Sequence, residues 1–182
     1  FVFTVTNTGG ASTGTLTTAL TGGGSDQFGI TTNGCMGMVL ASQATCAIAV
    51  RFAPTSAGAK SASLTVTGTP GGSAATSLNG MGLAPAMLAI APTTQNYGNV
   101  VTTNNSTATL TVTNAGGVMS GTPSVVLGGA DMALFTVASN TCVAALAPAG
   151  TCTVTVRFAP TATGLKAGTL TVSASPGGMA VT

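Results

Sequence analysis

The chain contains two copies of one sequence pattern, separated by about 106 residues. Phe3-Thr-Val-Thr-Asn-Thr-Gly-Gly10 returns as Leu110-Thr-Val-Thr-Asn-Ala-Gly-Gly117, at an offset of 107 residues. Cys46-Ala-Ile-Ala-Val-Arg-Phe-Ala-Pro54 returns as Cys152-Thr-Val-Thr-Val-Arg-Phe-Ala-Pro160, at an offset of 106 residues. This period is longer than that of small solenoid repeats, and it fits a self-sufficient domain repeated in tandem.

The repeat also predicts where the two domains begin and end. Ala84 to Thr107 has no counterpart before Phe1, and Ser77 to Gly82 has no counterpart after Thr182. We therefore expect a first repeat at 1–82 that lacks its N-terminal strands, and a second at 83–182 that lacks the end of its last strand. Such a chain is expected to be a slice of a longer array, or a subunit that neighbouring strands complete by β-augmentation.

Strand signals dominate the chain, because apolar and polar residues alternate in short runs bounded by Gly or Pro. One face of each such strand is buried and the other is solvated, as in antiparallel sheets. The fold class expected is all-β, with two tandem immunoglobulin-like antiparallel β-sandwiches. In the second copy we predict strands at Met87–Ile90, Tyr97–Val101, Thr107–Asn114, Ser124–Leu127, Phe135–Ala138, Cys152–Phe158, Gly168–Ser173 and from Ala180 onward.

Turn residues separate these runs. Asn7 to Gly10 and Asn114 to Gly117 are predicted turns, since Asn and Gly tolerate positive φ. Pro70-Gly-Gly72 and Pro176-Gly-Gly178 are expected to form the hairpin before the last strand of each copy.

Composition weighs against several classes of function. The chain has 4 Lys and Arg, 2 Asp, no Glu and no His, so nucleophilic or general acid–base catalysis lacks a placed base, and we expect no enzyme. The small positive balance is too weak for a nucleic-acid surface. Polar residues interrupt every apolar run before it could span a membrane as a helix. No cofactor is indicated.

Four cysteines are distributed as one pair in each copy. Cys35 and Cys46 match Cys142 and Cys152, so within-copy disulfides are the simplest of the three connectivities. Disulfides would place the chain in an oxidising compartment. Buried free thiols are the remaining alternative, whereas the missing histidines and CxxC spacing argue against a metal site.

Two overlapping sequons offer a candidate modification site. Asn104-Asn-Ser-Thr107 makes both Asn104 and Asn105 candidate glycan acceptors in an expected loop. The outward faces are rich in Thr and Ser and nearly free of charge, and such a surface is poorly protected against association. We expect it to be covered by an assembly or by glycan.

Several of these motifs together resemble a known family. They are Thr-Val-Thr-Asn-Thr-Gly-Gly, the Cys pair, Val-Arg-Phe-Ala-Pro-Thr-Ser-Ala-Gly, Leu-Thr-Val and Leu-Asn-Gly-Met-Gly. The chain resembles the abnormal-spindle/Hydin-type immunoglobulin-like repeat, in the bacterial secreted form found in choice-of-anchor D domain proteins. The resemblance implies a seven- to eight-stranded sandwich, tandem copies on exported or surface-attached proteins, and no shared catalytic residues. The near absence of charge departs from the family.

The function expected is therefore structural. We expect a subunit or segment of an extracellular filament, fibre or cell-surface stalk, whose partners are copies of itself or neighbouring repeats. The alternative is an adhesin or a carbohydrate- or protein-binding surface module. Sugar-binding faces usually expose aromatic rings, and this chain has no Trp and one Tyr, Tyr97. An exposed Tyr97 beside a groove would favour the alternative, and a Tyr97 packed at the domain junction would disfavour it.

Overall fold

The protein folds into two compact all-β units, unit 1 at Phe1–Gly82 and unit 2 at Leu83–Thr182. The computed structural model describes all residues, 1–182. Every strand pairing between named strands is antiparallel, and the only helical segments are two single turns of 3-10 helix, η1 (Ser25–Gln27) and η2 (Met132–Leu134). Neither helical turn has the length and apolarity that crossing a membrane requires.

Unit 1 consists of two three-stranded sheets. The first has the order β1-β4-β3 and the second the order β2-β5-β6. The bounds of the strands are β1 (Val2–Thr6), β2 (Thr17–Thr21), β3 (Phe28–Asn33), β4 (Thr45–Phe52), β5 (Gly58–Gly68) and β6 (Gly72–Gly82).

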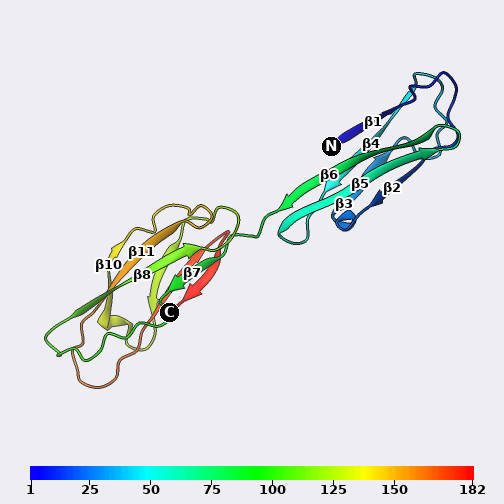
Figure 1. Cartoon of the computed structure of the whole chain (residues 1–182). Helices are drawn as coiled ribbons and strands as arrows, with labels where there is room; N and C mark the ends of the chain where they lie inside the picture. Colours follow the sequence, from blue (N-terminus) through cyan, green and yellow to red (C-terminus); the bar gives the residue numbers. More distant parts are fainter. The chain divides into compact units, whose positions relative to one another are not determined.

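Unit 2 has the same plan with one additional strand. Its sheets have the orders β10-β11-β8-β7 and β13-β12-β9, and the strands of the first sheet lie side by side in Figure 1. The bounds are β7 (Leu88–Ala91), β8 (Ser106–Asn114), β9 (Ser124–Gly128), β10 (Phe135–Asn140), β11 (Thr151–Phe158), β12 (Thr169–Ala174) and β13 (Gly178–Val181).

The two sheets of each unit share one hydrophobic core. In unit 2 the alternating apolar residues of β8, β11 and β12 meet there, and Val112, Val154 and Val172 are fully buried. In unit 1 the core combines Ile48 of β4 with Leu64 of β5. Because the buried set recurs at every second residue, a one-residue shift in register would expose it, and this fixes the pairing.

The hairpins between the last two strands depend on glycine. Gly71 and Gly72 have φ values of 129° and 79°, and Gly177 and Gly178 have φ values of 142° and 68°. Residues with a side chain rarely adopt these angles, whereas glycine does so without steric conflict. The predicted Pro-Gly-Gly hairpins are present in both units.

The strands of the second copy match the sequence analysis except at one place. β7 to β13 lie within one or two residues of seven predicted strands, but the strand predicted at Tyr97–Val101 is absent. Gly98 has a φ of 68°, which breaks an extended run. The Tyr97 side chain packs on Phe135 and Phe158 instead, so a local apolar contact, and not a sheet ladder, holds this segment.

Truncation of a core leucine in unit 2 gives a direct test of this packing. Leu88 of β7 is 4% exposed, whereas Leu165 is 97% exposed. Leu88→Ala should lower the free energy of unfolding by about 3 kcal/mol, because it removes buried apolar contacts and leaves a cavity. Urea unfolding followed by the fluorescence of Tyr97 measures it.

Leu165→Ala is the matched control and should change the urea midpoint very little. Equal effects of the two substitutions would contradict the core described here.

Candidate functional site: a duplicated loop clamp and a groove beside Tyr97

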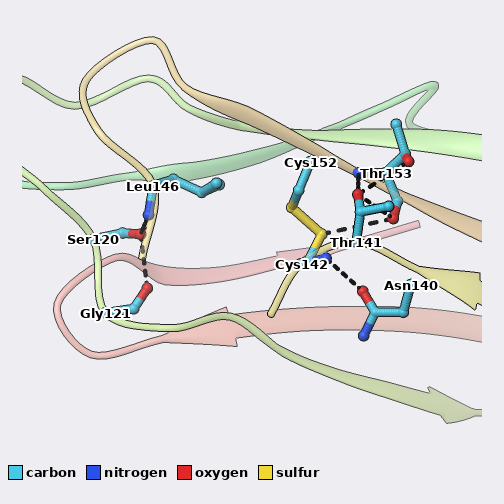
Figure 2. Close-up of a disulfide and its surroundings, with 8 residues drawn as sticks. All are labelled: Ser120, Gly121, Asn140, Thr141, Cys142, Leu146, Cys152 and Thr153. Atoms are coloured by element: carbon cyan, nitrogen blue, oxygen red, sulfur yellow. Dashed lines mark hydrogen bonds between the residues drawn. A yellow bond between two sulfur atoms is a disulfide. The ribbon is translucent and has the colours of Figure 1, made fainter. Parts of the chain in front are cut away.

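Each unit contains one disulfide that closes a short loop ahead of its central strand. Cys35 bonds to Cys46 across 11 residues, and Cys142 bonds to Cys152 across 10 residues. The Asn140 side chain accepts a hydrogen bond from the Cys142 N–H at 2.8 Å, as Figure 2 shows. On the chain-entropy model, closing a loop of this length is worth about 3 kcal/mol.

Each disulfide loop also inserts one leucine into the core, and two polar side chains hold that leucine in place. In unit 2 the Ser120 hydroxyl accepts a hydrogen bond from the Leu146 N–H at 3.0 Å (Figure 2), and the Asn114 amide donates to the Leu146 carbonyl at 3.0 Å. Leu146 is buried among the core residues. We call Asn114, Ser120, Leu146 and the Cys142–Cys152 bond the loop clamp of unit 2.

Asn114 is the centre of this loop clamp. Its side chain is fully buried and also donates to the Val118 carbonyl at 2.8 Å. Its carbonyl oxygen accepts from the N–H of Met87 at 3.1 Å and of Gly116 at 3.0 Å. One amide therefore satisfies backbone groups from the entry to β7, from the turn after β8 and from the disulfide loop.

Unit 1 repeats the loop clamp at equivalent positions, with Thr13 in place of Ser120. Asn7 donates to the Leu40 carbonyl at 2.9 Å, and the Thr13 hydroxyl accepts from the Leu40 N–H at 2.9 Å. Leu40 is 3% exposed. Asn33 accepts from the Cys35 N–H at 3.2 Å, as Asn140 does for Cys142. The same hydrogen bonds and the same buried leucine therefore close one end of the hydrophobic core in each unit.

The sequence analysis assigned Asn7 and Asn114 to turns and missed that each side chain holds the backbone of a disulfide loop. Asn7 and Asn114 recur at equivalent positions, as do Asn33 and Asn140, and this recurrence was the available signal. The reason given for the turns was also wrong, because none of these asparagines or their following glycines has positive φ. Gly116 is needed for a different reason, since a Cβ there would collide with the Pro85 carbonyl.

A groove of about 1080 Å³ lies in unit 2 beside Tyr97. The Tyr97 ring packs on Phe135 at 5.9 Å and on Phe158 at 5.5 Å between ring centroids, and its hydroxyl donates to the Val156 carbonyl at 3.3 Å. Partial burial raises the pKa of Tyr97 above its usual 10.0 by desolvation. Tyr97 is thus half-buried, and the side chains that it packs on belong to unit 2.

The remaining predicted site residues lie on the surface. Asn104 and Asn105 are exposed in the loop before β8, where both sequons are accessible. No group of three His, Cys, Asp or Glu side chains is arranged to hold a metal ion.

The disulfides indicate where the protein resides. Bonds of this kind persist in oxidising compartments and are rare in the cytosol. With all four cysteines paired, the chain fits an extracellular or periplasmic environment.

Comparisons with known proteins find distant structural similarity alone. No family model and no curated protein matches the chain. A protein of unknown function from Porphyromonas gingivalis W83 is 15% identical, with 99% of this chain and 89% of that chain covered and a TM-score of 0.41.

In two further solved structures, this chain matches only part of a longer protein. The red sea bream transglutaminase is 18% identical, with 100% of this chain and 28% of that chain covered and a TM-score of 0.38. The secreted serine protease VesC from Vibrio cholerae is 14% identical, with 97% of this chain and 47% of that chain covered and a TM-score of 0.35. At TM-scores this low, the similarities say nothing about what the chain does.

Removal of the Asn114 amide should strongly destabilise unit 2. Asn114→Ala leaves the N–H groups of Met87 and Gly116 and the carbonyls of Val118 and Leu146 without this partner, so we expect a loss of about 3 kcal/mol in the free energy of unfolding. Urea unfolding monitored by Tyr97 measures the loss.

The matched control is Asn140→Ala, which removes the one hydrogen bond of an exposed side chain and should cost less than about 1 kcal/mol. A loss at Asn114 no larger than at Asn140 would show that the loop clamp does not stabilise the fold.

Titration of Tyr97 tests its burial. Since folding raises the pKa of Tyr97, this group contributes stability that is complete below its unfolded pKa of about 10 and is lost as pH rises through the folded pKa. Ultraviolet difference absorbance should show the phenol titrating above 10.0 in the folded chain and at the ordinary value in urea. Identical titration curves in both states would mean that Tyr97 is solvated.

Proposed function

We propose that this chain is a non-catalytic structural segment of an extracellular filament, fibre or cell-surface stalk, built from two immunoglobulin-like β-sandwiches in tandem. The observation that carries the proposal is the duplicated loop clamp. Both units repeat the same disulfide, the same buried leucine and the same asparagine amide, so the elements common to the two copies are those that resist unfolding.

The strand order supports the immunoglobulin-like assignment. With β7 to β13 taken as strands A to G, the sheets of unit 2 read A-B-E-D and C-F-G, which is the constant-type immunoglobulin arrangement. Unit 1 reads B-E-D and C-F-G. The disulfides differ from the immunoglobulin pattern, because each joins the D–E loop to strand E and does not link the two sheets.

The surface supports association with neighbouring copies or repeats. Only six side chains in the chain are charged, and apolar residues such as Met36, Val39 and Val143 are more than half exposed. A weakly charged surface with exposed apolar residues favours packing against other protein surfaces. Disulfides and exposed sequons at Asn104 and Asn105 fit an exported protein that carries glycan.

A second function is favoured by one observation, the groove beside Tyr97. A binding module, such as an adhesin or a carbohydrate- or protein-binding surface module, would use a groove lined by an aromatic ring. The ring of Tyr97 is partly covered by Phe135 and Phe158, which leaves less of it to stack on a sugar.

Electron microscopy of the native material, with gold-labelled antibodies raised against this chain, tests the proposal. We expect label at regular intervals along filaments, fibres or stalks outside the cell, because tandem units with the same internal contacts should repeat along an axis. Cells that lack the protein are the control. Label confined to isolated short rods would overturn the structural function and favour the binding module.

A further inference from the structure

All seven methionines of the chain lie on its surface. Their exposed fractions run from 48% for Met38 to 68% for Met179. Methionine is one of the residue types most often fully buried, and eight of the 13 leucines of this chain are buried. Apolar character alone therefore does not explain where the methionines lie. The seven are Met36, Met38 and Met81 in unit 1 and Met87, Met119, Met132 and Met179 in unit 2.

Neither hydrophobic core contains a methionine. The buried residues of both cores are Leu, Ile, Val, Phe, Ala and Cys, and the side chains packed around them include no Met either. Methionine sulfoxide is polar and disrupts a core in which it forms. Because every thioether of this chain is outside the cores, oxidation of sulfur leaves the buried contacts of both units intact.

The fold does not require methionine at these positions. Met36 follows the first cysteine of unit 1, where unit 2 has Val143. Met179 follows the Pro-Gly-Gly hairpin of unit 2, where unit 1 has Ser73. The two units share one strand plan in spite of these differences, so the methionines are free of the packing constraints that fix the loop clamp.

The other readily oxidised side chains are missing or shielded. The chain has no Trp and no His, and all four cysteines are in disulfides. Three of these cysteines are buried, and the fourth is partly buried. The ring of Tyr97 packs on Phe135 and Phe158. An oxidant that approaches the folded chain therefore meets exposed thioethers, which are soft and polarizable, before it meets the disulfides or the phenol.

We propose that the seven methionines form an oxidant-consuming surface, which takes up hypochlorous acid or hydroperoxides while the fold stays intact. Each thioether sulfur attacks the oxidant and gains one oxygen atom, so that an S=O bond forms and the O–Cl or O–O bond breaks. The sulfur is oxidised by two electrons. Hypochlorous acid is reduced to chloride and a proton, and a hydroperoxide is reduced to its alcohol. This activity is additional to the proposed structural function and does not rest on it.

Stepwise titration of the folded chain with hypochlorous acid tests the proposal. We expect the intact mass to gain one oxygen atom for each equivalent, up to seven, and peptide mapping to place every oxygen on a methionine. The urea midpoint, followed by circular dichroism, and the ultraviolet absorbance of Tyr97 should stay unchanged over this range. Chlorination of Tyr97, or a fall in the urea midpoint, before the seventh oxygen is taken up would overturn the proposal.

Replacement of methionine by leucine removes the sulfur and keeps an apolar side chain of similar volume. Met36→Leu combined with Met38→Leu should lower the end point of the titration from seven oxygen atoms to five. With all seven methionines replaced by leucine, Tyr97 should be chlorinated from the first equivalents onward. If Tyr97 in that variant is protected as well as in the native chain, the methionines are not what consumes the oxidant.

A methionine placed inside the core tests whether surface placement protects the fold. Leu88→Met introduces a thioether at a buried position of β7 and conserves volume. Its sulfur should take up oxygen only after the seven surface sulfurs, and this eighth oxygen should lower the urea midpoint. Uptake of the eighth oxygen together with the first seven, with no fall in the midpoint, would contradict the proposal.

Discussion

One asparagine amide in each unit determines how the chain closes the end of its core. Asn114 is fully buried and exchanges hydrogen bonds with backbone groups near β7, after β8 and in the disulfide loop, and Asn7 occupies the same place in unit 1. Buried backbone groups must find partners, and an asparagine amide can serve donors and acceptors at once. The leucine of each disulfide loop reaches the core only because this amide and a neighbouring hydroxyl hold its backbone.

The loop clamp relates the architecture to the proposed function. A chain with six charged residues has few ion pairs with which to stabilise a fold, so its stability rests on core packing, backbone ladders, disulfides and buried amides. These interactions are local to each unit and are repeated in the next, as expected of modules in a tandem array. The surface then remains free to associate with other protein surfaces.

Much of this fold could be predicted from the sequence, because alternation of apolar residues reports directly on strands with one buried face. The periodicity around Leu110 and Val154 predicted β8 and β11, and Pro-Gly-Gly predicted both hairpins. The segment at Tyr97 was predicted as a strand because alternation cannot distinguish a ladder from a side chain packed on two phenylalanines. The buried role of Asn114 and the groove arise from contacts between residues distant in sequence, which a local pattern does not encode.

Mechanical unfolding of single chains tests most directly whether the two units are self-contained modules that resist force independently. Pulled from its ends, the oxidised chain should give two separate unfolding events, each shortened by the loop that its disulfide closes. Reduction should lengthen the two events by 11 and 10 residues, at about 3.5 Å for each residue. A single gradual extension without distinct events, or event lengths that do not change on reduction, would contradict the account of two independently stabilised units.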